Sequence, residues 1–201
     1  MFQHLRPAIV LIGLFMCLLG IAYPITVTMI AEAAMPGLAG GSLVQRSGVV
    51  IGSSLIGQEF RSDRYFHGRP SATSAPDPKD ASKTTDAPYN AASSSGSNLG
   101  PTSGKLIDRV TADIKALREE GVVLLPVPAD SVTTSASGLD PHISPENAAI
   151  QIARVAKARG IPEAKVRGIV TATTESRTLG IFGEPRVNVL ALNLALDTTA
   201  P

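Results

Sequence analysis

The stretch that decides the architecture runs from Pro7 to Ile30 and reads PAIVLIGLFMCLLGIAYPITVTMI. It contains no charged residue. At about 1.5 Å per residue, a helix of this length covers the ~30 Å hydrocarbon core of a bilayer. Because backbone polar groups in lipid must be paired within the segment, a helix is the expected conformation. The sequence therefore predicts one transmembrane helix over residues 7–30.

Small residues form a stripe along this helix. Gly13, Cys17 and Gly20 recur at spacings of four and three residues. Such a stripe lets another helix approach closely and is a candidate packing surface. The alternative is that it faces lipid, since small residues are common in membrane helices in general. Pro24 is expected to distort the helix near its far end.

The charges that flank the apolar segment indicate its direction. The α-amine, His4 and Arg6 precede it, and the first charge after it is Glu32. The positive-inside rule then places residues 1–6 in the cytoplasm and residues 31–201 outside it. A cleaved signal peptide is the alternative, because residues 31–33 (AEA) have the small-x-small form of a cleavage site. The apolar run is longer than a usual signal core, which favours an uncleaved anchor.

Residues 31–201 are expected to form a single soluble α+β domain behind the transmembrane helix. Short aliphatic runs separated by Ser-Gly and Gly-Ser pairs predict hairpin strands at Leu43–Val44, Val49–Ile51 and Leu55–Ile56. The composition of residues 71–104, rich in Ser, Ala, Pro, Asp, Asn, Thr and Gly, is typical of a disordered linker.

The C-terminal half has a more regular pattern. Apolar residues at helical spacing, with start and stop signals, predict helices over residues 106–120, over residues 144–160 and from Pro162 onward. Residues 122–127 are expected to form a buried strand. Residues 187–196 (VNVLALNLAL) fit either a strand or a strand that runs into a short helix.

Composition argues against several classes of function. A formal net charge of +1 gives no global signal for nucleic acid as a partner. Cys17 is the only cysteine, which excludes an intramolecular disulfide and a cysteine-based metal site. The three histidines lie far apart in sequence, so no local metal-binding motif is present.

Motifs for enzymatic chemistry are also absent. Residues 100–106 (GPTSGKL) resemble a phosphate-binding loop, but the glycine spacing is one residue short and Leu106 replaces the hydroxyl residue that would hold magnesium. No dinucleotide fingerprint, nucleophile elbow or Ser-x-x-Lys pair occurs. The sequence therefore predicts no catalytic residues.

Two polar sites remain as candidates for binding. Asp140 and His142 could form an acid–base pair, although Asp140-Pro141 favours a turn in which His142 is a local hydrogen-bond partner. Gln151 lies among apolar neighbours on a predicted helix. Its amide either finds a local partner, as most side-chain amides do, or contacts a ligand or another protein.

Four blocks of sequence carry a resemblance to a known family. They are YFHGRPSA (65–72), YNAASSSGSNLGP (89–101), SASGLDPHISPENAAIQIARVAKARG (135–160) and GEPRVNVLALNLALD (183–197). In this order, behind one N-terminal membrane helix, they closely resemble the C subunit of Kdp-type potassium-transporting ATPases. The resemblance spans nearly the whole chain. It also implies that residues 71–104 form an ordered loop of one domain and not a linker.

The resemblance implies a non-catalytic subunit of a high-affinity, ATP-driven potassium uptake complex in the bacterial inner membrane. Two partners are implied, a channel-like potassium-binding subunit and an ATP-hydrolysing P-type subunit. This chain lacks the Asp-Lys-Thr-Gly phosphorylation motif of P-type pumps. The phosphorylated aspartate is therefore expected in a partner, and ATP and potassium are expected to be handled by the complex.

The resemblance further implies that the chain acts as a catalytic chaperone, which raises the ATP affinity of the hydrolysing subunit. A glutamine after an Asp-Pro-His-type turn has been implicated in nucleotide binding, which maps to Gln151, with Ser135 and Gly138 nearby in sequence. The predicted topology conflicts with direct contact, because a periplasmic domain cannot reach a cytoplasmic nucleotide site. The alternative readings are a periplasmic membrane-anchored binding module or hydrolase that uses Asp140 and His142, or a purely structural scaffold.

Overall fold

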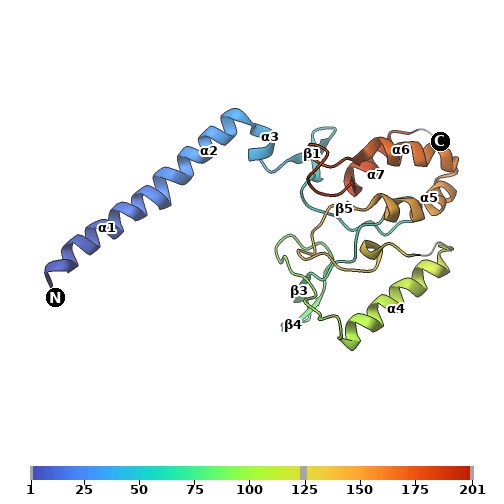
Figure 1. Ribbon diagram of the computed structural model, residues 1–201, viewed down its shortest axis with the longest axis horizontal. Coiled ribbons are helices and arrows are strands. Elements are labelled where there is room, and N and C mark those ends of the chain that lie inside the picture. Colours follow the sequence, from blue (N-terminus) through green and yellow to red (C-terminus); the bar gives the residue numbers. More distant parts are fainter. Residues whose placement is uncertain (1, 123–125, 200–201) are drawn as a thin grey trace. The chain divides into compact units, whose positions relative to one another are not determined.

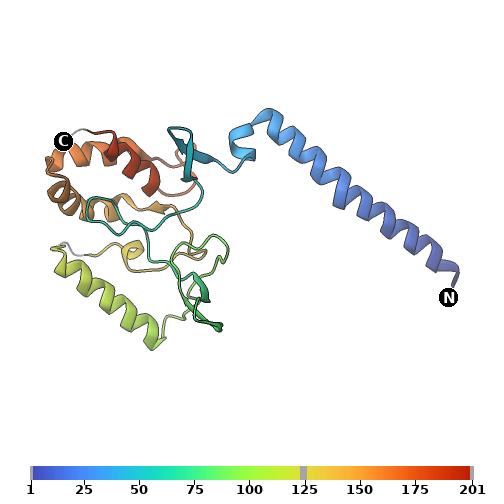
Figure 2. The same cartoon turned by 180° about the vertical axis from the view of Figure 1, so that it is seen from behind.

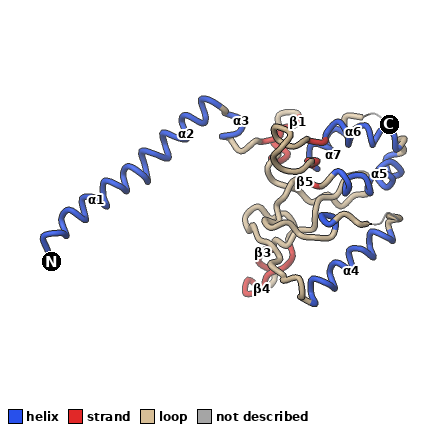
Figure 3. The backbone as a smooth tube through the Cα atoms, viewed as in Figure 1, coloured by secondary structure: helices blue, strands red, loops and turns tan. Residues whose placement is uncertain are grey.

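The computed structural model describes residues 2–122 and 126–199 of the chain. The fold has two compact units, Met1–Ser53 and Ser54–Pro201 (Figure 1). The first is a long helix followed by a hairpin. The second combines helices, short strands and long loops (Figures 2 and 3). The α+β class with an apolar N-terminal helix is confirmed, whereas the predicted domain limits 31–201 stay a prediction.

The first unit is dominated by a helix that is continuous through four consecutive segments. These are η1 (Phe2–His4), α1 (Leu5–Cys17), η2 (Leu18–Ala22) and α2 (Tyr23–Ala34). The stretch Leu5–Ala34 spans 30 residues, and its most apolar 18-residue window has a mean hydropathy of 2.5 and is not buried. By length and composition this helix can cross a membrane. It extends beyond the predicted span of residues 7–30 at both ends.

The middle of the helix, η2, has the wider π geometry. It ends two residues before Pro24, which lies in the first turn of α2 and has no backbone N–H to donate. Thr26 Oγ1 donates a hydrogen bond to the carbonyl of Ala22 at 2.8 Å. Gly13 and Cys17 lie in α1, whereas Gly20 lies in η2. The stripe therefore crosses from α to π geometry, and its role in helix packing stays a prediction.

A short helix and a hairpin complete the first unit. Helix α3 (Pro36–Ala39) is followed by β1 (Leu43–Arg46) and β2 (Val49–Ser53), which pair antiparallel. Ser47 and Gly48 both have positive φ, at 52° and 79°, as a tight two-residue hairpin turn requires. This hairpin confirms two of the three predicted strands.

The second unit contains the remaining elements. They are β3 (Ser74–Asp77), β4 (Asp80–Asp86), α4 (Gly104–Glu119), η3 (Ala129–Ser131), β5 (His142–Ile143), α5 (Pro145–Arg159), α6 (Glu163–Thr173), β6 (Thr174–Glu175), β7 (Arg186–Asn188) and α7 (Val189–Asp197). Strands β3 and β4 form one hairpin, and β5, β7 and β6 form a small antiparallel sheet with β7 in the centre. Figure 1 shows α4 on the far side of intervening loops from α6 and α7.

The hydrophobic core forms where α5, α6, α7 and β7 meet. Most of its side chains come from these elements, and Phe66 enters it from a loop. The fully buried large apolar residues are Phe66, Ile143, Ile152, Val155, Val166, Val187, Leu192 and Leu196. With about 25 cal/mol gained per Å² of apolar surface buried, this cluster is the main stabilising feature of the second unit.

The predicted helices agree with the structure. Ser144 caps α5 by accepting a hydrogen bond from Asn147 N–H, and Gly160 ends the helix in the left-handed conformation. For residues 187–196 the second reading is confirmed, since β7 runs directly into α7. The predicted strand over residues 122–127 lies largely outside the described residues. The third predicted hairpin strand is wrong, because Leu55 lies in a turn and Ile56 makes only a single bridge.

The linker expected from the composition of residues 71–104 is wrong, and the ordered loop implied by the family resemblance is confirmed. This stretch contains the β3–β4 hairpin and the start of α4. Ser71 Oγ donates to the carbonyl of Gly138 at 2.7 Å, and Ser95 N–H donates to the carbonyl of Ser137 at 3.0 Å. The Ser71 hydroxyl and the Ser95 backbone thus bond to specific backbone carbonyls far along the sequence.

Candidate functional site

Two buried side-chain amides hold the loop that crosses the core. Asn193 in α7 accepts a hydrogen bond from Phe66 N–H at 2.8 Å and donates to its carbonyl at 3.0 Å. Gln151 in α5 bonds His67 in the same way, at 2.8 and 3.1 Å. The amides thus satisfy both backbone groups of two successive residues, as a neighbouring strand would. We refer to Gln151 and Asn193 as the amide clamp.

The amide of Gln151 has no hydrogen-bonding capacity left. Its oxygen accepts from His67 N–H and from Arg154 Nη2 at 2.7 Å. Its nitrogen donates to the His67 carbonyl and to Asn147 Oδ1 at 2.9 Å. A side-chain amide offers two donors and two acceptor positions, so all four are occupied. Ligand contact through Gln151 stays a prediction, and it would have to displace one of these bonds.

The polar chain continues from Gln151 to the beginning of α5. Asn147 Nδ2 donates to Asp130 Oδ2 at 3.1 Å. The backbone N–H and the hydroxyl of Ser144 donate to the two oxygens of Asp130, at 2.7 and 2.8 Å. The carboxylate near the helix N-terminus is also favoured by the helix dipole. Asp130 therefore fixes the start of the helix that presents Gln151.

Arg154 forms the other end of the polar chain. Its side chain is 11 % exposed, and Nη1 donates to the carbonyls of Asp63 and Tyr65, each at 3.1 Å. Nε lies 3.4 Å from Glu120 Oε2, just beyond the end of α4. Burial lowers the pKa of Arg154, and the nearby carboxylates act against that shift. The guanidinium ties the loop before Phe66 to both α5 and α4.

His67 lies against this guanidinium. Its Nε2 is 3.4 Å from Arg154 Nη1 and 3.3 Å from the carbonyl of Ser62. Burial and the positive charge of Arg154 lower the pKa of His67 below its ordinary value of 6.5. The imidazole is therefore neutral at pH 7.

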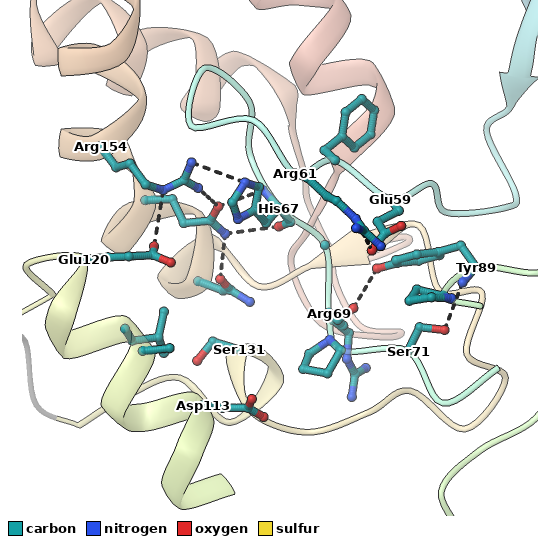
Figure 4. Close-up of a pocket in the computed structure, with 18 residues that line it drawn as sticks. Glu59, Arg61, His67, Arg69, Ser71, Tyr89, Asp113, Glu120, Ser131 and Arg154 are labelled. Carbon is teal, nitrogen blue, oxygen red and sulfur yellow. Dashed lines mark hydrogen bonds and ion pairs between the residues drawn. The ribbon is translucent and has the colours of Figure 1, made fainter. Parts of the chain in front are cut away.

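A cavity of about 440 Å³ opens between α4 and the loop over residues 59–71 (Figure 4). Two of its arginines pair with carboxylates that also line it, Arg61 with Glu59 at 2.9 Å and Arg154 with Glu120. Asp113 also faces the cavity, and burial raises its pKa. The lining carries both signs of charge, which does not favour a polyanion such as the phosphates of a nucleotide.

Asp140 and His142 form the local arrangement expected from the Asp-Pro turn. Asp140 Oδ1 accepts from His142 N–H at 3.0 Å, and Oδ2 accepts from Arg69 Nη1 at 3.0 Å. Burial acts to raise the pKa of Asp140, but the bonds from His142 and Arg69 outweigh it and hold the pKa below its usual range. A carboxylate engaged on both oxygens is not poised as a general acid or base at neutral pH.

The two remaining predicted ligand residues, Ser135 and Gly138, lie in closely packed surroundings. Ser135 is 5 % exposed. Gly138 has a φ of +68°, and a Cβ there would lie 2.5 Å from Thr73 Cγ2 and 2.7 Å from the Ser95 carbonyl. Ser135 lines a hollow that does not include Gln151. Asp140 lines the same hollow as Ser135, so the structure brings these two predicted ligand residues together and separates them from Gln151.

Several residues of this network were missed from the sequence. Asn193 is a lone polar residue in an apolar helix, the same signal that singled out Gln151. Tyr89 Oη donates to the carbonyl of Arg69 at 2.7 Å, and burial raises the pKa of Tyr89 to about 12. Arg154 gave no signal, because basic residues on a helix are usually solvated. Among the described residues, no cluster of three or more His, Cys, Asp or Glu could hold a metal ion.

Comparison with known proteins gives consistent results. Residues 5–198 match the profile of the family described as KdpC, K+-transporting ATPase, c chain. A potassium-transporting ATPase KdpC subunit from Methylobacterium nodulans is 62 % identical over 200 residues, which cover 100 % of this chain and 99 % of the relative. Subunits of the same name from Bradyrhizobium diazoefficiens and Rhodopseudomonas palustris are 58 % and 57 % identical, with 99 % and 100 % of each relative covered.

Proposed function

Because the chain belongs to the KdpC family, the c chains of K+-transporting ATPases, we propose that it is a non-catalytic subunit of an ATP-driven potassium uptake complex. It is required for the assembly and activity of that complex. Its partners are a channel-like potassium-binding subunit and an ATP-hydrolysing P-type subunit. The observation that carries the non-catalytic role is the full internal bonding of Gln151 and Asp140, the polar side chains best suited to chemistry.

We further propose that the chain is anchored in the bacterial inner membrane by Leu5–Ala34 and that its second unit faces the periplasm. The apolar span supports the anchor. The charges around the span, with Arg6 before it and Glu32 after it, support the orientation. This arrangement lets the helix contact partner helices while the second unit contacts their external loops.

The proposed effect on ATP hydrolysis is to raise the apparent ATP affinity of the hydrolysing subunit, as a catalytic chaperone. This effect is transmitted through the membrane partners and not by contact with the nucleotide. Two observations support an indirect route. The amide of Gln151 has no free donor or acceptor, and the cavity that it lines pairs its cations with carboxylates.

A deletion experiment tests the subunit role. The chain is removed from a strain that has no other potassium uptake system, and growth is followed at low potassium. We expect no growth without the chain and full growth when the wild-type chain is supplied from a plasmid. Normal growth of the deletion strain would contradict the proposal.

A kinetic experiment separates the chaperone role from a purely structural scaffold. Partner subunits are purified with and without the chain, and ATP hydrolysis is measured over a range of ATP concentrations. We expect the fraction of the partners that still assembles without the chain to hydrolyse ATP with a higher KM for ATP. An unchanged KM, with only the yield of assembled complex reduced, would show a scaffold.

A further inference from the structure

The most exposed apolar residues of the second unit lie in one turn. Strands β6 and β7 form a hairpin whose connection, residues 176–185, is exposed throughout. Leu179, Ile181 and Phe182 are 84, 72 and 64 % exposed. We refer to these three residues as the apolar turn. Single exposed apolar residues are common on protein surfaces, whereas three in one tight turn form a contiguous apolar patch of the kind that is often functional.

The apolar turn has a fixed conformation. Thr178 and Phe182 exchange two backbone hydrogen bonds, at 2.9 and 3.0 Å. Leu179 has a φ of +55°, in the left-handed region that leucine rarely adopts, and Gly180 follows at +73°. A leucine in this conformation is strained, and the strain persists because the surrounding bonds hold it. The turn is therefore preorganised to present its apolar side chains outward.

The charges at the base of the turn exclude a simple electrostatic attraction to lipid. Arg177 pairs with Glu184, and Arg186 pairs with Glu175. Each arginine on the hairpin thus has a carboxylate partner, and the turn itself carries no lysine. Segments that bind anionic membrane surfaces instead combine apolar residues with unpaired basic ones. A protein surface without strong charge is the better complement.

The area of the apolar turn decides which kind of protein surface it fits. Its three side chains can bury on the order of 400 Å², whereas a stable interface buries about 800 Å² on each partner. The turn alone is too small to hold a free soluble protein or a second copy of the chain. It suffices for a partner that the membrane helix already keeps close, because tethering raises the effective concentration.

We propose that the apolar turn inserts into an apolar hollow on the external face of another subunit of the same transport ATPase. This inference rests on the proposed function and deepens it, because it assigns the contact of the second unit with its partner to residues 179–182. Phe182 is the central anchor, since buried aromatic residues dominate such contacts.

Cross-linking in the intact complex tests the inference directly. A photoreactive benzoylphenylalanine replaces Phe182 in the full chain, expressed with its partners in cells. Irradiation is expected to join the chain to another subunit of the complex, identified by mass. The matched control places the same group at Ile107, an exposed apolar position on α4 that is 57 % exposed. Adducts only with lipid, only with a second copy of the chain, or with no subunit would overturn the inference.

A substitution measures how much the contact contributes. Phe182→Asp is compared with Ile107→Asp in the purified complex, and the ratio of this chain to the ATP-hydrolysing subunit is quantified. We expect Phe182→Asp to lower the ratio at least about threefold and Ile107→Asp to leave it unchanged. Equal ratios in the two variants would contradict the inference. Both positions are exposed, so we expect both variants to fold. Circular dichroism of the two purified chains checks this.

The subunit role and the role of the apolar turn can be refuted separately. If the wild-type chain restores growth at low potassium but benzoylphenylalanine at position 182 captures no partner subunit, the role of the apolar turn is refuted and the subunit role stands. If the deletion strain grows normally, the subunit role itself is refuted.

Discussion

The side-chain amide of Gln151 and the backbone of His67 form two hydrogen bonds, at 2.8 and 3.1 Å, although the residues are separated by 84 positions in the sequence. The bonds join α5 to the loop that carries Phe66 into the core. A glutamine in this position stabilises the fold of the second unit. We therefore predict that a substitution at Gln151 acts on transport through the shape of that unit, and the experiments below separate this from contact with a ligand.

Replacing Gln151 with alanine is expected to destabilise the second unit. The change leaves both backbone groups of His67 and the amide oxygen of Asn147 without their partner in a buried site, and the expected loss is about 2–3 kcal/mol in the free energy of unfolding. Urea unfolding of the full chain in detergent measures it. Lys157→Ala, on the exposed face of the same helix, is the control and should change the free energy by less than about 0.5 kcal/mol.

The same variant distinguishes a structural role from nucleotide contact. At a temperature where the Gln151→Ala chain is still folded, complexes that contain it should show the wild-type KM for ATP. A raised KM in a fully assembled, folded complex would instead support direct participation of Gln151 in nucleotide binding.

Gly138 and Gly160 provide a matched pair for backbone strain. Both have a φ of +68°, but a Cβ at Gly138 would lie 2.7 Å from the carbonyl of Ser95, whereas nothing lies within 4 Å at Gly160. Gly160→Ala should cost about 1 kcal/mol, the usual penalty of alanine in this conformation. Gly138→Ala should cost several times more, because the backbone must also move. Equal melting temperatures for the two variants would show that the loop at Ser95 yields easily.

His67 predicts a dependence of stability on pH. Its pKa is lowered in the folded state by burial and by Arg154, so the unfolded chain binds more protons as the pH falls below about 6.5. Stability should therefore decrease as the pH falls through about 6.5 toward 5.5, whereas well above pH 6.5 this group should cause no dependence on pH. In His67→Gln, which keeps a polar side chain without a titrating group, the slope over this window should flatten. A slope that persists unchanged would assign the effect to another group.

The regular elements could be predicted because their signals are local. The Ser144-Pro145-Glu146 start and the Gly160 stop define α5 without reference to the rest of the chain. The apolar run at residues 7–30 defines a membrane-length helix in the same way. Composition alone could not predict that residues 71–104 adopt a defined structure. Ser71 bonds to Gly138 and Ser95 bonds to Ser137, and both partners lie far along the sequence.

In the candidate site, too, the contacts between residues distant in the sequence could not be predicted. Gln151 was identified as a polar residue among apolar neighbours, and both of its possible roles were open. Asn147 and Arg154 are neighbours of Gln151 on the same helix, but only the tertiary structure supplies the backbone of His67, which occupies the remaining donor and acceptor positions of the amide. Pairing of Asp140 with Arg69 is likewise invisible in the sequence, since 71 positions separate the two residues.

The most direct test of the account is the side of the membrane on which the second unit lies. In a Cys17→Ser background, single cysteines are introduced by Ala136→Cys, at an exposed position, and by Gln3→Cys, before the apolar helix. Ser135→Cys, at a position that is 5 % exposed, reports on reaction with buried thiols. Intact cells are treated with a membrane-impermeant thiol reagent. The account predicts labelling at position 136 in intact cells and at position 3 only after lysis. Labelling at position 136 only after lysis would place the second unit in the cytoplasm and contradict the indirect route to ATP affinity.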